Sequence, residues 1–257
     1  MIELFLYNFL GQPQDQMPET RSNFVGNAVM LFASADAITA SLATLTHNAM
    51  NGRPTYEITP GGYFYYPPGH DTQAPFNGFE AGIWTYHPKE PGGPKLSRPA
   101  MDSIRAMLDI ARAHDLELIF LATPNHAYVD YYLDAIGAWG LVEEWLVELS
   151  AQATVYSFSQ PNAWVYEPVG NRMIYWNDPF HFSLTMGRGM LASLAGLPMS
   201  GLPDNFMERV APERVASLID RRRQAVRLWA QANPAFVARF EDERRKWLAA
   251  QPPGTPK

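Results

Sequence analysis

Hydrophobic positions in the second half of the chain alternate between helical and strand spacing. After Ser97-Arg98-Pro99, apolar residues recur every three or four positions and predict a helix ending near His114 (Met101, Ile104, Leu108 and Ala111). The run LELIFLATP at 116–124 follows directly and is typical of a buried strand. A helical stripe at 140–152 and the strand TVYSF at 154–158 repeat this order. Alternating helices and strands predict an α/β fold with a parallel sheet and crossover helices.

The first hundred residues are less regular. Residues 2–7 (IELFLY) form a short apolar run that predicts a buried strand, and residues 34–47 predict a short amphipathic helix with Ser34 as its N-cap. Residues 52–96 are dense in glycine, proline and aromatic residues. Within them we expect a hairpin around Pro60-Gly61-Gly62 and otherwise a long surface loop, of a length that is often functional.

The last third of the chain predicts further helices. One covers residues 184–194, and two more, at 211–229 and 234–248, form a helical hairpin around Asn233-Pro234. Residues 251–257 (QPPGTPK) are expected to be a disordered tail.

The expected organisation is an α/β domain at 1–205, with the glycine-, proline- and aromatic-rich insertion at about 52–96, followed by a helical segment at 206–250. The formal charge of −6 is unevenly placed, since the residues from Ala211 onward carry ten Lys or Arg against five Asp or Glu. A basic segment can bind nucleic acid or anionic lipid. Here acidic residues interleave with the basic ones at helical spacing, which favours a solvated helix face, and no nucleic-acid partner is expected.

Composition excludes several kinds of site. The chain has no cysteine, so disulfides, thiolate nucleophiles, zinc–thiolate sites and iron–sulfur clusters are absent. No apolar run is long enough to span a bilayer, and the first basic residue is Arg21, so the start of the chain does not predict a signal peptide. The sequence motifs of α/β-hydrolases, P-loop enzymes, dinucleotide-binding proteins and zincins are missing. We expect no cofactor and no metal.

Ligands of parallel α/β sheets bind beyond the carboxyl ends of the strands. That rule selects Asn8, then Asn125 and His126 after the strand at 116–124, and finally the loop Trp176-Asn177-Asp178-Pro179-Phe180-His181. Asn125, His126 and Trp176 are predicted to line a pocket. In the loop, Asp178 is placed to hydrogen-bond the imidazole of His181 and so orient a general base, which would act on Ser, Thr or water.

Each of these residues also has a structural interpretation. Asp178 is also placed to turn the loop before Pro179, and His181 to pack near the start of the next helix, and the spacing by itself favours this structural interpretation. His126 is placed to cap a helix starting near Ala127. Ser34, in the sequence VMLFASADAI, has the setting of a nucleophile but is fully explained as an N-cap.

Three longer runs carry a resemblance to a known family: LELIFLATPNHAYV, GLVEEWLVELSAQATVYSFSQPNAW and RMIYWNDPFHFSLTMGRGML. They resemble the C-terminal half of SGNH/GDSL-type hydrolase-like proteins of bacterial envelopes, which are related to proteins that acylate or deacylate surface polysaccharides. The resemblance implies a three-layer SGNH-like fold with a parallel sheet. It further implies Asp178 and His181 as catalytic acid and base, and Asn8 as an oxyanion ligand. Where relatives often carry Asp-Phe-Ser, this chain has Ser157-Phe158-Ser159.

The family's nucleophile-bearing first block would precede residue 1, so the resemblance predicts a domain lacking its first strands. Its complete form would be a serine esterase or O-acyltransferase acting on an acylated cell-surface glycan, and the chain as given is expected to be inactive. Relatives are located at the cell envelope or periplasm, anchored by an N-terminal membrane helix. The alternative is a non-catalytic carbohydrate-binding or assembly module of the same fold, whose aromatic loop offers rings for stacking on sugars (Tyr63, Phe64, Tyr65, Tyr66, Trp84 and Tyr86).

Overall fold

The computed structural model describes residues 2–4, 57–58, 64–65, 70–86 and 95–250. The chain divides into two compact units, one made of residues 1–12 and 71–257 and the other of residues 13–70. In the second unit, β2 (Glu57–Ile58) and β3 (Phe64–Tyr65) pair antiparallel, which confirms the hairpin predicted around Pro60-Gly61-Gly62. The helix predicted at 34–47 and the tail at 251–257 lie outside the described residues.

The first unit is an α/β structure built on a mixed sheet with strand order β1-β4-β5-β6. Strands β1 (Ile2–Leu4), β4 (Ile119–Ala122) and β5 (Thr154–Ser157) run parallel, as the sequence predicted. The fourth strand, β6 (Glu208–Val210), is antiparallel to β5, so the expectation of a purely parallel sheet is wrong. Its direction reverses because the chain enters β6 at the edge where β5 ends, with Glu208 opposite Ser157.

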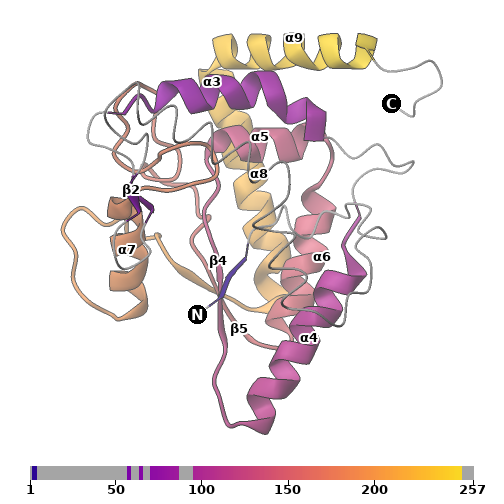
Figure 1. The fold of residues 1–257 in the computed structure, drawn as a ribbon, viewed down its shortest axis with the longest axis vertical. Helices are drawn as coiled ribbons and strands as arrows, with labels where there is room; N and C mark the ends of the chain where they lie inside the picture. Colours follow the sequence, from indigo (N-terminus) through magenta and orange to yellow (C-terminus); the bar gives the residue numbers. More distant parts are fainter. Residues whose placement is uncertain (1, 5–56, 59–63, 66–69, 87–94, 251–257) are drawn as a thin grey trace, which may run out of the picture. The chain divides into compact units, whose positions relative to one another are not determined.

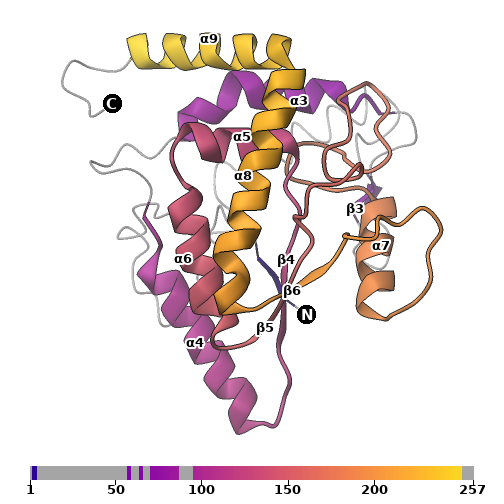
Figure 2. The same ribbon diagram turned by 180° about the vertical axis from the view of Figure 1, so that it is seen from behind.

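Helices lie on both sides of this sheet. Helices α4 (Arg98–Ala113), α6 (Trp139–Ser150) and α8 (Val215–Ala232) lie on one side of β4 and β5, and α7 (Leu184–Leu194) lies on the other (Figures 1 and 2). Helix α5 (Ala127–Ala135) follows β4 and packs against α8. The connection from β4 to β5 therefore contains two helices.

Local sequence explains the helices that were predicted best. In α4 the Ser97 hydroxyl accepts a hydrogen bond from the Ala100 N–H at 3.4 Å, and the four predicted apolar positions are its buried residues. Helix α7 has the predicted bounds, and its N-cap Ser183 accepts from the Met186 N–H at 3.4 Å. An N-cap side chain together with a regular apolar stripe marks both helices without any tertiary information.

A helical segment replaces part of the loop expected at 52–96. Helix α3 (Gln73–Gly82) continues into the 3₁₀ turn η3 (Ile83–Tyr86). Its apolar side chains recur at helical spacing and are buried (Phe76, Phe79, Ile83 and Trp84). The loop prediction was wrong here because Pro75, Gly78 and Gly82 suggested a break. Proline is tolerated in the first turn of a helix, and burial of the aromatic face outweighs the poor helix propensity of the glycines.

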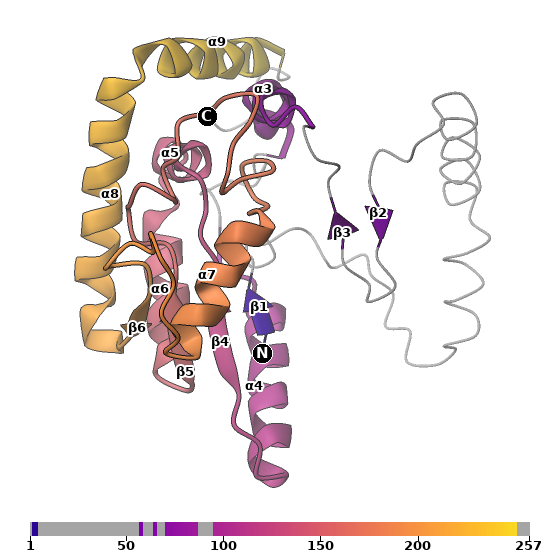
Figure 3. The ribbon, with the colours of Figure 1, turned by 90° about the vertical axis from the view of Figure 1, so that its left-hand side faces the viewer.

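The C-terminal helices differ in geometry from the predicted hairpin. Helix α9 (Pro234–Ala250) runs across the end of α8 instead of folding back along it (Figure 3). Helix α8 contributes Val215, Leu218, Ile219 and Val226 to the core. Helix α9 packs on α3. At this contact the Arg239 guanidinium donates two hydrogen bonds to the Glu80 carboxylate, from Nε at 2.7 Å and from Nη2 at 2.9 Å. The basic C-terminal segment thus belongs to the same packed unit as the sheet.

Most described cations of that segment are paired with carboxylates. Arg222 is buried and binds Asp130 of α5 at 2.6 Å, and the Asp130 carboxylate also accepts a hydrogen bond from the Tyr166 hydroxyl at 2.9 Å. Further ion pairs involve Arg214, Arg221, Arg239, Arg244, Arg245 and Lys246. This pairing favours the interpretation of the segment as a solvated helix face over that of a lipid- or nucleic-acid-binding surface.

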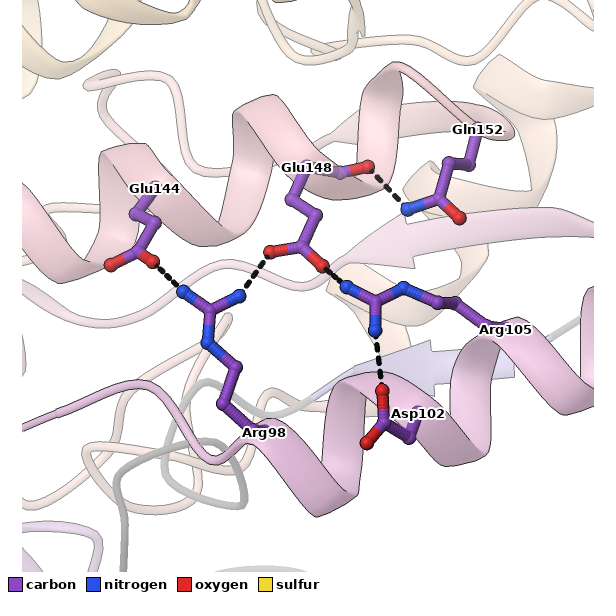
Figure 4. Close-up of polar contacts among 6 residues, drawn as sticks. All are labelled: Arg98, Asp102, Arg105, Glu144, Glu148 and Gln152. Carbon is purple, nitrogen blue, oxygen red and sulfur yellow. Dashed lines mark hydrogen bonds and ion pairs between the residues drawn. The ribbon is translucent and has the colours of Figure 1, made fainter.

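An ion-pair network joins α4 to α6 at the surface (Figure 4). Glu148 of α6 receives contacts from both Arg98 and Arg105 of α4, the former at 2.8 Å. Arg98 also pairs with Glu144, and Arg105 with Asp102 of its own helix. The network holds the solvent-facing edges of the two helices together above their buried stripes.

Candidate active site

The carboxyl ends of β4 and β5 lie in register at one edge of the sheet. Ala122 is opposite Ser157, and the next residue, Phe158, donates its backbone N–H to the Ala122 carbonyl at 3.0 Å. The Ser159 hydroxyl then donates to the Thr123 carbonyl at 3.0 Å. Hydrogen bonding thus continues past the strands and fixes the segments that leave this edge.

A hairpin-like segment, residues 174–183, lies beside this edge, and we call it the dyad arm. Trp176 and Phe182 form an antiparallel bridge, and the Ser183 N–H donates to the Tyr175 carbonyl at 2.7 Å. Nearer the tip, the Asn177 N–H donates to the His181 carbonyl at 2.9 Å. The arm therefore closes on itself by backbone hydrogen bonds and presents residues 178–181 at its tip.

Asp178 and His181 are in direct contact at that tip. One carboxylate oxygen of Asp178 accepts the backbone N–H groups of Phe180 and His181 at 2.8 and 2.9 Å. The other oxygen lies 2.7 Å from Nδ1 of His181. The same carboxylate thus turns the loop and orients the imidazole, so the two interpretations drawn from the sequence are both present in one geometry.

Exposure differs sharply between the two side chains. The Asp178 side chain is 15% exposed and the His181 side chain 63% exposed. With Nδ1 donating to the carboxylate, the tautomer assigned to His181 is the one that carries its basic lone pair on Nε2. An imidazole that is held by a partly buried carboxylate and faces solvent has the arrangement of an oriented general base.

His126 has a different environment. It is the N-cap of α5, where Nδ1 accepts the Tyr128 N–H at 3.3 Å, and Nε2 donates to the Glu167 carbonyl at 2.8 Å. Its side chain is fully buried, and burial lowers the pKa of His126 from the ordinary 6.5 to about 4. His126 is therefore neutral near neutral pH, and both ring nitrogens serve the fold.

The backbone of His126 connects the sheet edge to the dyad arm. Its N–H donates to the Pro179 carbonyl at 3.2 Å, next to Asp178. The ring of Phe180 in the arm contacts the edge of Phe79 of α3 at 5.4 Å between centroids. The arm is thus held against the N-terminus of α5 and against α3.

The residues predicted to line a pocket are gathered here, with unequal exposure. Trp176 is fully buried, packs edge-on against the His126 ring at 5.5 Å and donates its Nε1–H to the Trp164 carbonyl at 2.9 Å. Asn125 is half-buried. The rings of His126 and Trp176 are therefore packed in the interior and not on a solvent-facing pocket wall, and their ring nitrogens are hydrogen-bonded inside the protein.

Glu167 is a functional candidate that sequence reasoning missed. Its two carboxylate oxygens accept the backbone N–H groups of Ile174 and Tyr175 at 2.7 and 2.8 Å, at the base of the dyad arm. The available signal was its position in the loop that follows β5, beyond the carboxyl end of a strand. Its partners are backbone groups, which leave no mark in the sequence, so its role was not predictable.

Other predicted residues fall elsewhere. Asn8 and Ser34 lie outside the described residues, as do Tyr63 and Tyr66 of the aromatic loop. Trp84 is only 2% exposed and packs against Tyr132 and Phe240, so its ring belongs to the core. In the segment Ser157-Phe158-Ser159 the Ser157 hydroxyl accepts the Ser159 N–H at 3.3 Å inside the protein.

The described residues contain no further site of the kinds considered below, and the chain has no match among known proteins. Among the described residues, no three histidine or carboxylate side chains are grouped so as to hold a metal ion, and no helix is long and apolar enough to cross a membrane. Comparison with models of protein families, with curated proteins and with solved structures gives no match. The geometry of Asp178 and His181 is therefore the main indication of function in the described residues.

Proposed function

We propose that the chain carries the acid–base half of a serine-hydrolase-type site that catalyses ester hydrolysis or O-acyl transfer. The observation that carries this proposal is the 2.7 Å contact between His181 Nδ1 and an Asp178 carboxylate fixed by two backbone N–H groups. In this arrangement Asp178 orients the imidazole and stabilises the imidazolium that forms when Nε2 accepts a proton.

The proposed reaction follows from these roles. His181 Nε2 takes the proton of a serine or threonine hydroxyl, or of water, as the oxygen attacks the ester carbonyl. The imidazolium then gives that proton to the departing alcohol. With an enzyme hydroxyl as nucleophile, an acyl-enzyme forms first and is resolved by water or by a second alcohol, which distinguishes hydrolysis from transfer.

The finer assignments are part of the same proposal. By resemblance to SGNH-type proteins, the fold is an SGNH-like three-layer arrangement and the substrate is an acylated cell-surface glycan. The location of α7 and of α4, α6 and α8 on opposite sides of the sheet supports such an arrangement (Figures 1 and 2). Asn8 remains the proposed oxyanion ligand, supported by the pairing of Leu4 with Ala122, which puts the end of β1 at the same edge as the end of β4.

The test is release of acetate from a small acetate ester. It is made on the 257-residue chain and on any natural product that contains this chain together with the nucleophile block of SGNH-type proteins, because residues 1–257 show no such block. We expect little or no turnover by the 257-residue chain and clear turnover by a longer product that carries the block. Replacement of the general base in His181→Ala should lower the rate by roughly 10²- to 10⁴-fold, and Asp178→Asn should lower it by a smaller factor.

His114→Ala is the matched control, because His114 is an exposed histidine at the end of α4 and far along the chain from the arm. Turnover that survives His181→Ala would contradict the proposal, as would a longer product with no turnover of any ester. Retention of the protein on a glycan affinity gel, unchanged by Asp178→Ala and His181→Ala, would instead support the non-catalytic binding module.

A further inference from the structure

Glu167 contacts the dyad arm and the end of the sheet at the same time. Its carboxylate accepts the N–H groups of Ile174 and Tyr175, where the arm begins. Its backbone carbonyl accepts the Nε2–H of His126, the first residue before α5. Glu167 therefore joins the segment of His126 to the start of the arm at Tyr175, although these two residues are 49 positions apart in the sequence.

These contacts close a ring of hydrogen bonds around the dyad. His126 donates its ring N–H to Glu167 and its backbone N–H to Pro179 at 3.2 Å. Pro179 is in the tip of the arm, and the arm leads back through its own bridge at Trp176 and Phe182 to Tyr175 and Glu167. The tip that holds Asp178 and His181 is thus tied at its outer end by His126 and at its base by Glu167.

The contact of the Glu167 carboxylate with the start of the arm differs chemically from the contact that holds the adjacent loop. Two backbone N–H groups point at one carboxylate, and such charge-assisted hydrogen bonds are about twice as strong as neutral ones. The adjacent loop is held by a neutral contact instead, in which the Thr72 hydroxyl donates to the Gly170 carbonyl and accepts the Met173 N–H. That contact ends one residue before the arm begins. Among the described hydrogen bonds, those of Glu167 are the ones that link a side chain outside the arm to the backbone of the arm's first strand.

We propose that Glu167 is a positioning residue for the Asp178–His181 dyad, acting through the backbone of the dyad arm and through His126. The described hydrogen bonds of Glu167 go to Ile174, Tyr175 and His126 and not to Asp178 or His181. This inference gives a function to Glu167 that rests on the proposed catalytic role of the dyad, but the geometry it predicts can be measured without any activity.

The experiment is nuclear magnetic resonance of the full chain in wild-type and Glu167→Gln forms. A glutamine keeps the shape of the side chain but offers one carbonyl oxygen, so one of the two N–H groups meets an amide NH₂ and loses its acceptor. We expect the amide hydrogens of Ile174 and Tyr175 to exchange with solvent about tenfold faster. We also expect loss of the downfield signal of the His181 Nδ1 proton that is bonded to Asp178.

Two variants serve as controls. Glu117→Gln makes the same chemical change at an exposed glutamate before β4 and should leave both signals unchanged. Leu218→Ala removes a buried side chain of α8 and lowers overall stability without touching the ring. It should therefore leave the His181 Nδ1 signal in place in the folded protein. If Glu167 only stabilised the fold, Glu167→Gln would likewise leave this signal in place.

The wild-type protein provides a measurement that needs no variant to fold. The amides of Ile174 and Tyr175 should be protected from exchange although the Ile174 side chain is largely exposed. Unprotected amides at both positions would overturn the proposal, and so would a His181 Nδ1 signal that is unchanged in Glu167→Gln. If the ester assay fails while these signals behave as expected, the geometry stands and the proposed catalytic function is what fails.

Discussion

His126 and His181 belong to the same hydrogen-bonded ring but lie in opposite surroundings. His126 is fully buried, and both of its ring nitrogens are bonded to the backbone. His181 is mostly exposed, and its Nδ1 is bonded to a carboxylate. Burial lowers the pKa of His126 to about 4, which removes it from acid–base chemistry near neutral pH.

The difference shows how environment assigns the role of a histidine. A ring whose nitrogens are both used inside the protein stabilises the chain around it and has no lone pair to offer to a substrate. A ring that is oriented from one side by a carboxylate and reaches solvent has the arrangement required for proton transfer. His126, the structural histidine, is hydrogen-bonded to the arm through Pro179, and His181, the exposed histidine, is part of the arm.

The largest expected effect tests whether the two histidines contribute differently to stability, and it is obtained by removing each ring in turn. His126→Ala leaves a cavity and deprives the Tyr128 N–H and the Glu167 carbonyl of their partners, so the free energy of unfolding should fall by about 4 kcal/mol. His181→Ala removes an exposed ring and should lower it by less than about 1 kcal/mol. Urea unfolding monitored by tryptophan fluorescence measures both values.

His114→Ala, at an exposed position, gives the baseline for loss of a surface histidine and should change stability by less than about 0.5 kcal/mol. Equal losses for His126→Ala and His181→Ala would show that the two rings contribute alike, and the assignment of His126 as a structural residue would then be wrong.

Stability should also depend on pH through His126. Its pKa is about 4 in the folded protein and 6.5 ordinarily, so below pH 6.5 the unfolded chain binds a proton that the folded chain does not. The contribution of neutral His126 to the free energy of unfolding is fully present above pH 6.5 and is lost as the pH falls to about 4. A difference of this size corresponds to roughly 3 kcal/mol, at 1.36 kcal/mol per pKa unit.

Urea midpoints measured between pH 7 and pH 4 test this expectation. The control is His126→Asn, because asparagine is able to cap α5 but does not titrate. Other titrating groups contribute equally to both proteins. The difference between the wild-type and variant slopes of urea midpoint against pH therefore reports the titration of His126 alone. Parallel slopes over this range would contradict the burial argument.

Locally encoded features were the most predictable parts of the fold and the site. The stripe of α4 and the bounds of α7 follow from apolar periodicity and from the caps Ser97 and Ser183. Contact between Asp178 and His181 was anticipated for the same reason, since a spacing of three residues within one turn brings the side chains together. These features need only a few consecutive residues.

Features that depend on distant residues were missed. Strand β6 has only three residues, two of them charged, and its pairing with β5 depends on the path of the chain through the preceding loop. Helix α3 is stabilised by burial of aromatic rings against α5 and α9, which overrides its glycines and proline. The contact of Glu167 with backbone N–H groups has no counterpart in residue type or spacing.

The smallest expected effect sharpens the comparison at the surface, in the α4–α6 network (Figure 4). Glu148→Gln weakens the contacts with Arg98 and Arg105, whose side chains are 56% and 41% exposed. Because solvent and salt screen exposed charges, the free energy of unfolding should fall by about 0.5 kcal/mol, and by less in 1 M salt. Urea unfolding at low and high salt measures both values, and Glu117→Gln, which breaks no described ion pair, is the control. A loss as large as that of His126→Ala would show that burial is not what separates the two regions.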